Sequence, residues 1–209
     1  MPRRYLQLDL VNLSFRVATA LVTGLFVYRL GSSYWAHPQR VTLMLLLVSE
    51  LATLLTILLS RRPTIRDLNP AYMLLTVVAS FIVPLFVRAE GTTHLLPETL
   101  SSGIVIAGLL WTIYAKVSLG RSFGLLAAQR IIKVKGAYRF VRHPIYAGYF
   151  LVHVGYLMAN CNWENAFIIV TFYAMQVMRA LREEKILSHD KTYQSYCQVT
   201  KYRFIYGVI

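Results

Sequence analysis

Residues 144–181 read PIYAGYFLVHVGYLMANCNWENAFIIVTFYAMQVMRAL, and this stretch decides the fold class. It holds two apolar segments, near 145–160 and 163–181, which are separated by Cys161 and Asn162 alone. A helix needs about 20 apolar residues to cross a bilayer, with a range of about 17 to 25. The stretch therefore predicts a tight transmembrane helical hairpin whose first arm is short.

Four further apolar segments precede this hairpin, near 12–30, 41–59, 71–87 and 99–118. The chain is 56% hydrophobic and 15% charged, whereas soluble domains carry roughly 25% charged residues. We therefore predict an all-α fold, a polytopic integral membrane helical bundle of about six transmembrane helices. A count of five stays open because the hairpin boundaries are the least defined. We expect no cleaved signal peptide, since Arg3 and Arg4 are followed by charged residues without a small-residue cleavage site.

The basic residues predict the orientation of the bundle. With six spans, the N-terminus, the 60–70 loop, the 119–144 loop and the tail from 179 share one side and carry seventeen Lys and Arg, against three on the other side. Because basic loops stay in the cytoplasm, we expect both termini and the 119–144 loop to be cytoplasmic. The same rule, with attraction to anionic lipid headgroups, explains the excess of 22 Lys and Arg over 9 Asp and Glu without nucleic acid.

Other polar residues exclude some functions and leave one question open. The five His and two Cys lack ligand spacing, so we expect neither a metal site nor a disulfide framework. Arg16 and Glu50 fall inside predicted spans, where a charge is a functional candidate by default. We favour a structural explanation, in which the two side chains pair or Arg16 reaches the nearby interface.

The segment before the hairpin combines a turn with a helix start. Gly136 precedes Tyr138 and predicts a tight turn, since glycine adopts backbone conformations that other residues avoid. His143 and Pro144 predict the start of a helix, because proline has no N–H to lose in a first turn. The free N–H groups there favour an anionic group such as a carboxylate. A basic interfacial flank is the simpler alternative for this dipeptide.

Beyond the hairpin, the chain places two carboxylates beside a cation. Arg179 and Glu183 are four residues apart and share one helix face. Glu183 and Glu184 directly after a span are unusual, because cytoplasmic flanks favour Lys and Arg. In an arbitrary helix such residues would form a solvated surface pair. The tyrosines of the tail fit an interfacial aromatic belt better than a stacking platform; they are Tyr193, Tyr196, Tyr202 and Tyr206.

The sequence GAYRFVRHPIYAG at 136–148 closely resembles the signature of the isoprenylcysteine carboxyl methyltransferase family, which is related to membrane phospholipid N-methyltransferases. Three further parts of the chain also resemble the family: residues 118–123, the spacing from Arg179 through Glu183 and Glu184 to the tyrosines, and the ending at 202–205. The resemblance covers about 90 residues, from 118 to the end. It implies an S-adenosylmethionine-dependent membrane methyltransferase. Residues 1–118 would hold the first four helices, and 119–209 a catalytic region with a cytoplasmic cofactor pocket.

The resemblance also implies roles for individual residues. Arg179 matches a residue involved in substrate binding. The chain departs from the family at 130–133, where His-x-Leu-Val is usual, and at 188–191, where Phe-Gly is common. The residues that match the family's cofactor-binding positions are Arg130, Ile131, Ile132, Lys133, Tyr138, His143, Pro144, Ile145, Tyr146 and Glu183.

The chemistry of methyl transfer adds catalytic candidates. A sulfonium methyl group is already activated, so transfer needs an in-line approach within about 3–3.5 Å more than a strong acid or base. A carboxylate acceptor would be anionic and could pair with Arg142 or Arg179, whereas an amine or thiol would need deprotonation by Glu183 or Glu184. We therefore predict Arg142, Arg179 and Glu184 as catalytic residues. The acceptor would be a lipophilic or prenylated molecule, first of all an isoprenylcysteine-type carboxylate, that enters sideways from the membrane.

Two rival functions stay open at this stage. Membrane sterol-type reductases, which use NADPH, share a similar Arg-His-x-x-Tyr element and tail pairs like Tyr196-Cys197 and Tyr202-Arg203. They are usually longer, and the Glu183-Glu184 pair fits the methyltransferases better. A phospholipid or thiol methyltransferase differs only in the acceptor. A transporter is disfavoured because the sequence has no inverted repeat.

Overall fold

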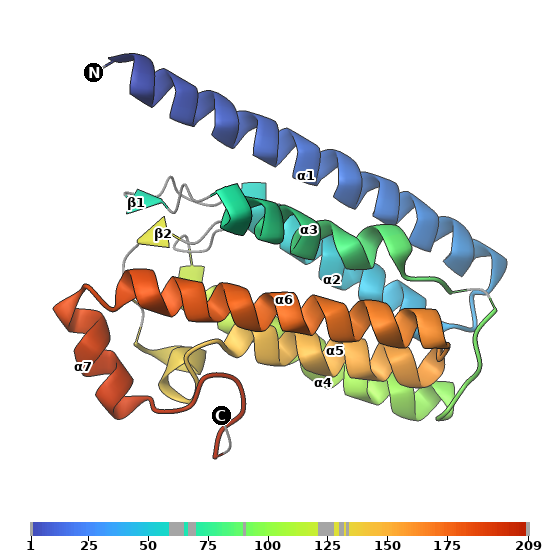
Figure 1. Cartoon of the computed structure of the whole chain (residues 1–209). Coiled ribbons are helices and arrows are strands. Elements are labelled where there is room, and N and C mark those ends of the chain that lie inside the picture. The colour runs from blue at the N-terminus through green and yellow to red at the C-terminus, as the bar shows by residue number, and fades with distance from the viewer. Residues whose placement is uncertain are drawn as a thin grey trace.

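The structure, a computed structural model, describes residues 2–58, 65–66, 70–89, 91–120, 128–129, 132 and 134–207. Over these residues the predicted all-α class is confirmed (Figure 1). A 3-10 helix, η2 (Gly136–Arg139), and an antiparallel pair of two-residue strands, β1 (Ile65–Arg66) and β2 (Ala128–Gln129), accompany the α-helices. The seven α-helices are α1 (Pro2–Ala36), α2 (Val41–Leu58), α3 (Pro70–Phe86), α4 (Glu98–Leu119), α5 (Pro144–Ala159), α6 (Trp163–Leu187) and α7 (Lys191–Val199).

Each of the six predicted apolar segments corresponds to one helix, α1 to α6 in chain order, and the predicted bounds 41–59, 71–87 and 145–160 end one residue beyond α2, α3 and α5. Among the described residues, α4 is the helix that is long and apolar enough by itself to cross a membrane. The apolar stretch Val41–Ala52 of α2 and the whole of α5 are shorter. The helices are therefore confirmed, together with one candidate membrane span, and the count of six spans stays a prediction.

The hairpin predicted from residues 144–181 is present. Its first arm, α5, has 16 residues, and its second arm, α6, has 25. Asn162 caps the start of α6, because its side-chain oxygen accepts a hydrogen bond from the Asn165 N–H at 2.6 Å. Helix α6 continues to Leu187, beyond the predicted end at 181, and so carries Glu183 and Glu184.

Helices α4 and α5 approach each other at backbone distance. A Cβ atom added at Gly108 would lie 2.6 Å from the Val152 nitrogen, and one at Gly155 would lie 2.9 Å from the Ser101 oxygen. At Gly148 it would overlap the Thr112 hydroxyl. Only glycine fits at these positions, so the α4–α5 seam, defined by these three glycines, fixes α5 against the longest apolar helix.

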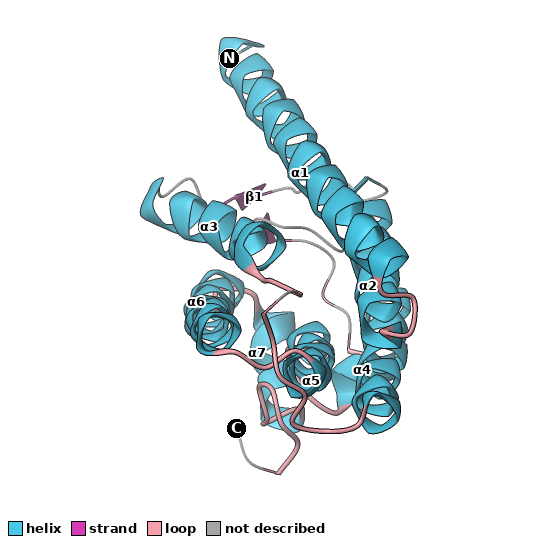
Figure 2. Ribbon diagram, turned by 90° about the vertical axis from the view of Figure 1, so that its right-hand side faces the viewer, coloured by secondary structure: helices cyan, strands magenta, loops and turns pink. Residues whose placement is uncertain are grey.

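The remaining helices complete the bundle around this seam. Helix α4 packs on α2 as well as on α5, and α3 packs on α6 (Figure 2). The core between them is apolar, and the buried residues that form it are Phe26, Leu30, Leu43, Leu46, Val83, Val87, Val105, Leu109, Val152, Tyr156 and Phe172. Its position leaves the polar residues of the 136–143 segment at one end of the bundle.

The segments predicted on one side of the membrane gather at one end of the bundle. There β1 pairs with β2, with Ile65 opposite Gln129, so the 60–70 loop meets the 119–144 loop. Helix α7 and the start of α1 lie at the same end (Figure 1). At the other end Thr93 and Cys161 exchange backbone hydrogen bonds of 2.8 Å. The arrangement agrees with the grouping of loops that the basic residues predicted.

Candidate active site

The segment before α5 is fixed on the end of α4. Gly136 has φ +68°, a conformation that favours glycine, and a Cβ atom there would overlap the Ser118 side chain. The Ala137 N–H donates to the Ser118 hydroxyl at 3.1 Å, and the Trp111 indole N–H donates to the Pro144 carbonyl at 2.9 Å. Helix α5 begins at Pro144. The predicted turn and helix start are therefore both confirmed.

Glu184 is the centre of a buried ionic cluster. One carboxylate oxygen lies 3.1 Å from His143 Nε2, and the other accepts from Arg142 Nη1 at 3.1 Å and from Arg203 Nε at 3.0 Å. Glu184 is only 8% exposed. We call Glu184 with Arg142, His143 and Arg203 the Glu184 clamp. It joins α6 to the segment before α5 and to the C-terminal tail.

Backbone bonds strengthen the attachment of the tail. The Arg142 N–H donates to the Tyr202 carbonyl at 2.9 Å, and the His143 N–H donates to the Arg203 carbonyl at 2.8 Å. Arg142 Nη2 donates to the Lys201 carbonyl at 2.9 Å, and Arg142 Nη1 lies 3.6 Å from the Cys197 sulfur. Both terminal nitrogens of Arg142 are thus used within the protein.

The electrostatics of the clamp keep Glu184 ionised. Glu184 itself lies outside the predicted membrane span, which ends at residue 181. Its burial raises its pKa, but the hydrogen bond and charge of His143, and then those of Arg203 and Arg142, outweigh burial. The net result is a lowered pKa, so Glu184 is a carboxylate at neutral pH.

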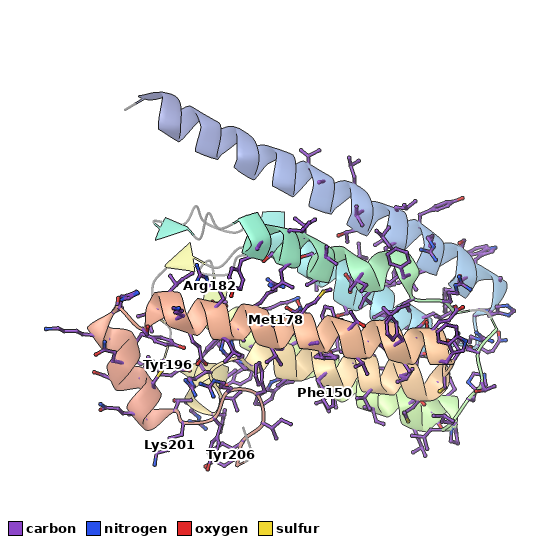
Figure 3. The ribbon with its side chains drawn as sticks, in the orientation of Figure 1. Phe150, Met178, Arg182, Tyr196, Lys201 and Tyr206 are labelled. Carbon is purple, nitrogen blue, oxygen red and sulfur yellow. The ribbon has the colours of Figure 1, made fainter. Side chains whose placement is uncertain are left out.

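Aromatic rings cover the clamp. The rings of His143, Tyr146 and Phe204 form a triangular cluster, in which the His143 centroid lies 5.6 Å from that of Tyr146 and 5.4 Å from that of Phe204, and the latter two are 6.4 Å apart. The Tyr196 hydroxyl donates to the Tyr138 carbonyl at 2.6 Å, which holds α7 against this segment. Figure 3 labels Tyr196 on α7. Tyr193 and Tyr196 are buried, so the interpretation as an interfacial belt is wrong for these two residues. The reason is that α7 folds back onto the protein rather than lying free.

Glu183 and Arg179 belong to a second face of α6. Successive residues of a helix are about 100° apart, so Glu183 and Glu184 point to different sides. The charges of Glu183 and Arg179 both act on Tyr146. Burial, followed by the charge of Glu183, raises the pKa of the Tyr138 phenol well above its ordinary value. We call Tyr138, Tyr146, Arg179 and Glu183 the tyrosine face. Arg179 Nη1 donates to the Gln176 amide oxygen at 2.7 Å, which orients the guanidinium.

Most of the predicted site residues lie together at this end of the bundle. Ile132 is half-buried, and Arg130, Ile131 and Lys133 lie outside the described residues. Sequence reasoning did not single out Arg203 or Phe204 as site members; the resemblance at 202–205 was the available signal. The predicted residues that the structure brings together are Tyr138, Arg142, His143, Pro144, Ile145, Tyr146, Arg179, Glu183 and Glu184.

Comparison with known proteins confirms the resemblance. Residues 96–189 match the model of the isoprenylcysteine carboxyl methyltransferase family. The match runs from the start of α4 through the end of α6, and so includes the α4–α5 seam, the turn at 136, the start of α5 and both glutamates. It stops before α7 and Arg203. No curated protein matches the chain. Over this region the chain is therefore similar to a membrane-bound family of methyltransferases that use S-adenosylmethionine.

Proposed function

We propose that this S-adenosylmethionine-dependent methyltransferase methylates the carboxylate of an isoprenylcysteine-type lipid or prenylated protein at the membrane surface. One observation carries the proposal. The family match falls on the stretch whose polar residues the structure gathers at one end of the bundle, around the start of α5. A phospholipid amine or a lipophilic thiol is the alternative acceptor.

The residues present fit the cofactor. Aromatic rings of Tyr146, His143 and Phe204 offer stacking surface for an adenine or a sulfonium. The Glu183 carboxylate suits an ammonium or ribose hydroxyls, and the first N–H groups of α5 suit a carboxylate. Residues 130–133, Tyr138, Pro144 and Ile145 complete the set that the resemblance implies. When bound, S-adenosylmethionine supplies the activated methyl group.

The contacts divide the catalytic candidates into two kinds. Arg142 and Glu184 hold each other and the tail, so we assign them as positioning residues that set the His143 ring. Arg179 lies on the tyrosine face beside Glu183, and we assign it to the acceptor. An anionic carboxylate acceptor needs a cation and a dry approach rather than a base, so the assignment of Glu184 as a base applies only to an amine or thiol.

Membrane topology forms part of the proposal. Six spans would place both termini, the tyrosine face and the Glu184 clamp on the cytoplasmic side. Support comes from the common end of the bundle that holds β1, β2 and α7, where the basic segments gather. A lipophilic acceptor would then stay in the bilayer while its polar end reached the surface.

A direct assay tests the function. Purified protein in nanodiscs is supplied with S-adenosylmethionine and N-acetyl-S-farnesylcysteine, and the methyl ester is measured. S-adenosylhomocysteine should raise the melting temperature, because a ligand at about 100 times its Kd stabilises the folded state by about 2.7 kcal/mol. NADPH should leave the melting temperature unchanged. A shift with NADPH alone, or methylation of a phospholipid amine in place of the carboxylate, would contradict the proposal.

A further inference from the structure

Two ionisable side chains lie inside the helix bundle close to the proposed site. Glu50 of α2 and Lys116 of α4 both fall within predicted membrane spans, and Glu50 lies within electrostatic range of Lys116. Lys116 is only 7% exposed, and Glu50 is half-buried. Arg16, the partner expected from the sequence, is among the residues whose side chains the structure does not describe. Among the described residues, the cation whose charge acts on Glu50 is therefore Lys116, from a different helix.

Lys116 also contacts the aromatic residues beside the site. Its ammonium lies 5.2 Å from the centroid of the Tyr149 ring, which places a cation against a π face. The neighbouring Ala115 is fully buried and packs with Ala137, Ile145 and Tyr149. Ala137 lies in the turn before α5, and Ile145 is in the first turn of α5. Lys116 is thus level with the start of α5, where the cofactor-binding residues begin.

Tyr149 connects Lys116 to the tyrosine face. It interacts electrostatically with both Tyr138 and Tyr146, and it lies three residues after Tyr146 on the same face of α5. Arg179 acts on Tyr146 from α6, while Lys116 contacts Tyr149 from α4. Two cations from different helices therefore approach one row of tyrosines on α5. Helices α2 and α4, which carry Glu50 and Lys116, pack against each other (Figure 2).

We propose that Lys116 is an acceptor-binding residue: its ammonium, which lies over the Tyr149 ring, attracts the anionic end of the lipophilic acceptor on the α4 side of the tyrosine row formed by Tyr146 and Tyr149. The inference rests on the proposed function and deepens it. An ionisable side chain within a membrane span is expensive unless it is paired, and it commonly marks a substrate path. A buried lysine also binds an anion as a compact point charge on a flexible stem, without fixed directions. This suits a carboxylate that arrives on a mobile lipid.

The simpler alternative is that Lys116 and Glu50 form a structural ion pair and nothing more. A structural pair predicts loss of stability when either charge is removed, with equal effects on charged and neutral ligands. An acceptor-binding lysine predicts that the preference for a carboxylate is lost while the cofactor product still binds. The two explanations therefore differ in a measurable ratio of affinities.

The test compares two probes that differ in one group. Binding of N-acetyl-S-farnesylcysteine and of its carboxamide is measured in nanodiscs with S-adenosylhomocysteine present, so that no methyl transfer occurs. The variants are Lys116→Met, which removes the ammonium and keeps an unbranched chain one atom shorter, Lys116→Arg, which keeps the charge, and Lys191→Met as the matched control. Lys191 is exposed on α7, so its substitution by Met removes the same charge outside the proposed acceptor site.

Wild type should bind the carboxylate about 10- to 150-fold more tightly than the carboxamide, the range for a charged hydrogen bond in a buried site. Lys116→Met should lose most of this preference with S-adenosylhomocysteine affinity within about twofold of wild type. Lys116→Arg and Lys191→Met should retain the preference. A full preference in Lys116→Met, no preference in wild type, or a parallel loss of S-adenosylhomocysteine binding would overturn the inference. Absence of methyl transfer in a wild type that keeps the preference would instead contradict the proposed function alone.

Discussion

The Glu184 carboxylate accepts a hydrogen bond from the Arg203 guanidinium, with 3.0 Å between Oε2 and Nε. Because the same carboxylate also holds His143, the position of the tail and the position of the His143 ring depend on one side chain. The relationship explains how a segment outside the family match belongs to the site.

Removal of the Glu184 charge should loosen the tail. We expect Glu184→Gln to lower the free energy of unfolding by about 2–3 kcal/mol, because hydrogen bonds to charged groups contribute about 1.5–3 kcal/mol each and their cations would stay behind. Thermal unfolding measures the loss of stability, and limited proteolysis after Lys201 measures the loosening of the tail. Glu164→Gln is the control, since its partner Arg88 has a 62% exposed side chain and such a pair contributes about 0–1 kcal/mol. Equal losses of stability in Glu184→Gln and Glu164→Gln would contradict the prediction that the Glu184 clamp contributes more than an exposed ion pair.

The stability that Glu184 contributes should depend on pH. Its pKa is lower in the folded protein than the ordinary value of 4.5, so the folded state binds the proton less tightly than the unfolded state. The contribution is therefore complete above about pH 4.5 and is lost as the pH falls from that value through the folded pKa. Melting temperatures of wild type and Glu184→Gln should converge below about pH 4.5. A constant difference down to pH 3 would contradict this assignment.

Glu183 and Arg179 should affect different ligands. Glu183→Gln should weaken S-adenosylhomocysteine binding about 10- to 150-fold, the range for loss of a buried charge-assisted hydrogen bond. Arg179→Ala should leave that affinity nearly unchanged and raise the acceptor KM or lower turnover. Calorimetry and the methyl ester assay separate the two outcomes. An exposed pair four residues apart contributes only about 0.3–0.5 kcal/mol, and small, equal effects would favour that description.

The proposed topology can be checked by cysteine labelling. In a background with Cys161→Ser and Cys197→Ser, the substitutions Thr64→Cys and Lys133→Cys should react with a membrane-impermeant reagent from the cytoplasm, and Thr92→Cys from outside. The native cysteines are replaced because both are free thiols. Labelling of 92 and 133 from the same side would disprove the six-span arrangement.

The sequence predicted elements whose signals are local. The apolar segments gave the helices, Gly136 gave the turn, and Pro144 gave the start of α5, because each depends on residues within one or two turns of the chain. The pairing of β1 with β2 was not predicted. It involves two residues in each strand, too few for a pattern.

Contacts between distant residues were the part that the sequence could not supply. It could not tell which of two adjacent glutamates faces inward, since that depends on the rotation of α6 in the bundle. Glu184 meets Arg142 across 42 positions, and Lys116 of α4 lies over the Tyr149 ring of α5. Burial of Tyr193 likewise depends on where α7 folds back. Such choices are made by packing, which a single sequence does not display.

The α4–α5 seam restricts how a lipid can arrive. With backbone atoms in contact at Gly108, Gly148 and Gly155, no hydrocarbon chain passes between these two helices at any of the three levels. If the acceptor enters sideways from the bilayer as proposed, it must therefore pass through another helix pair. A lipid that met the bundle at the α4–α5 seam would reach the tyrosines of α5 only by moving around these two helices, so the seam would restrict entry to the other sides of the bundle.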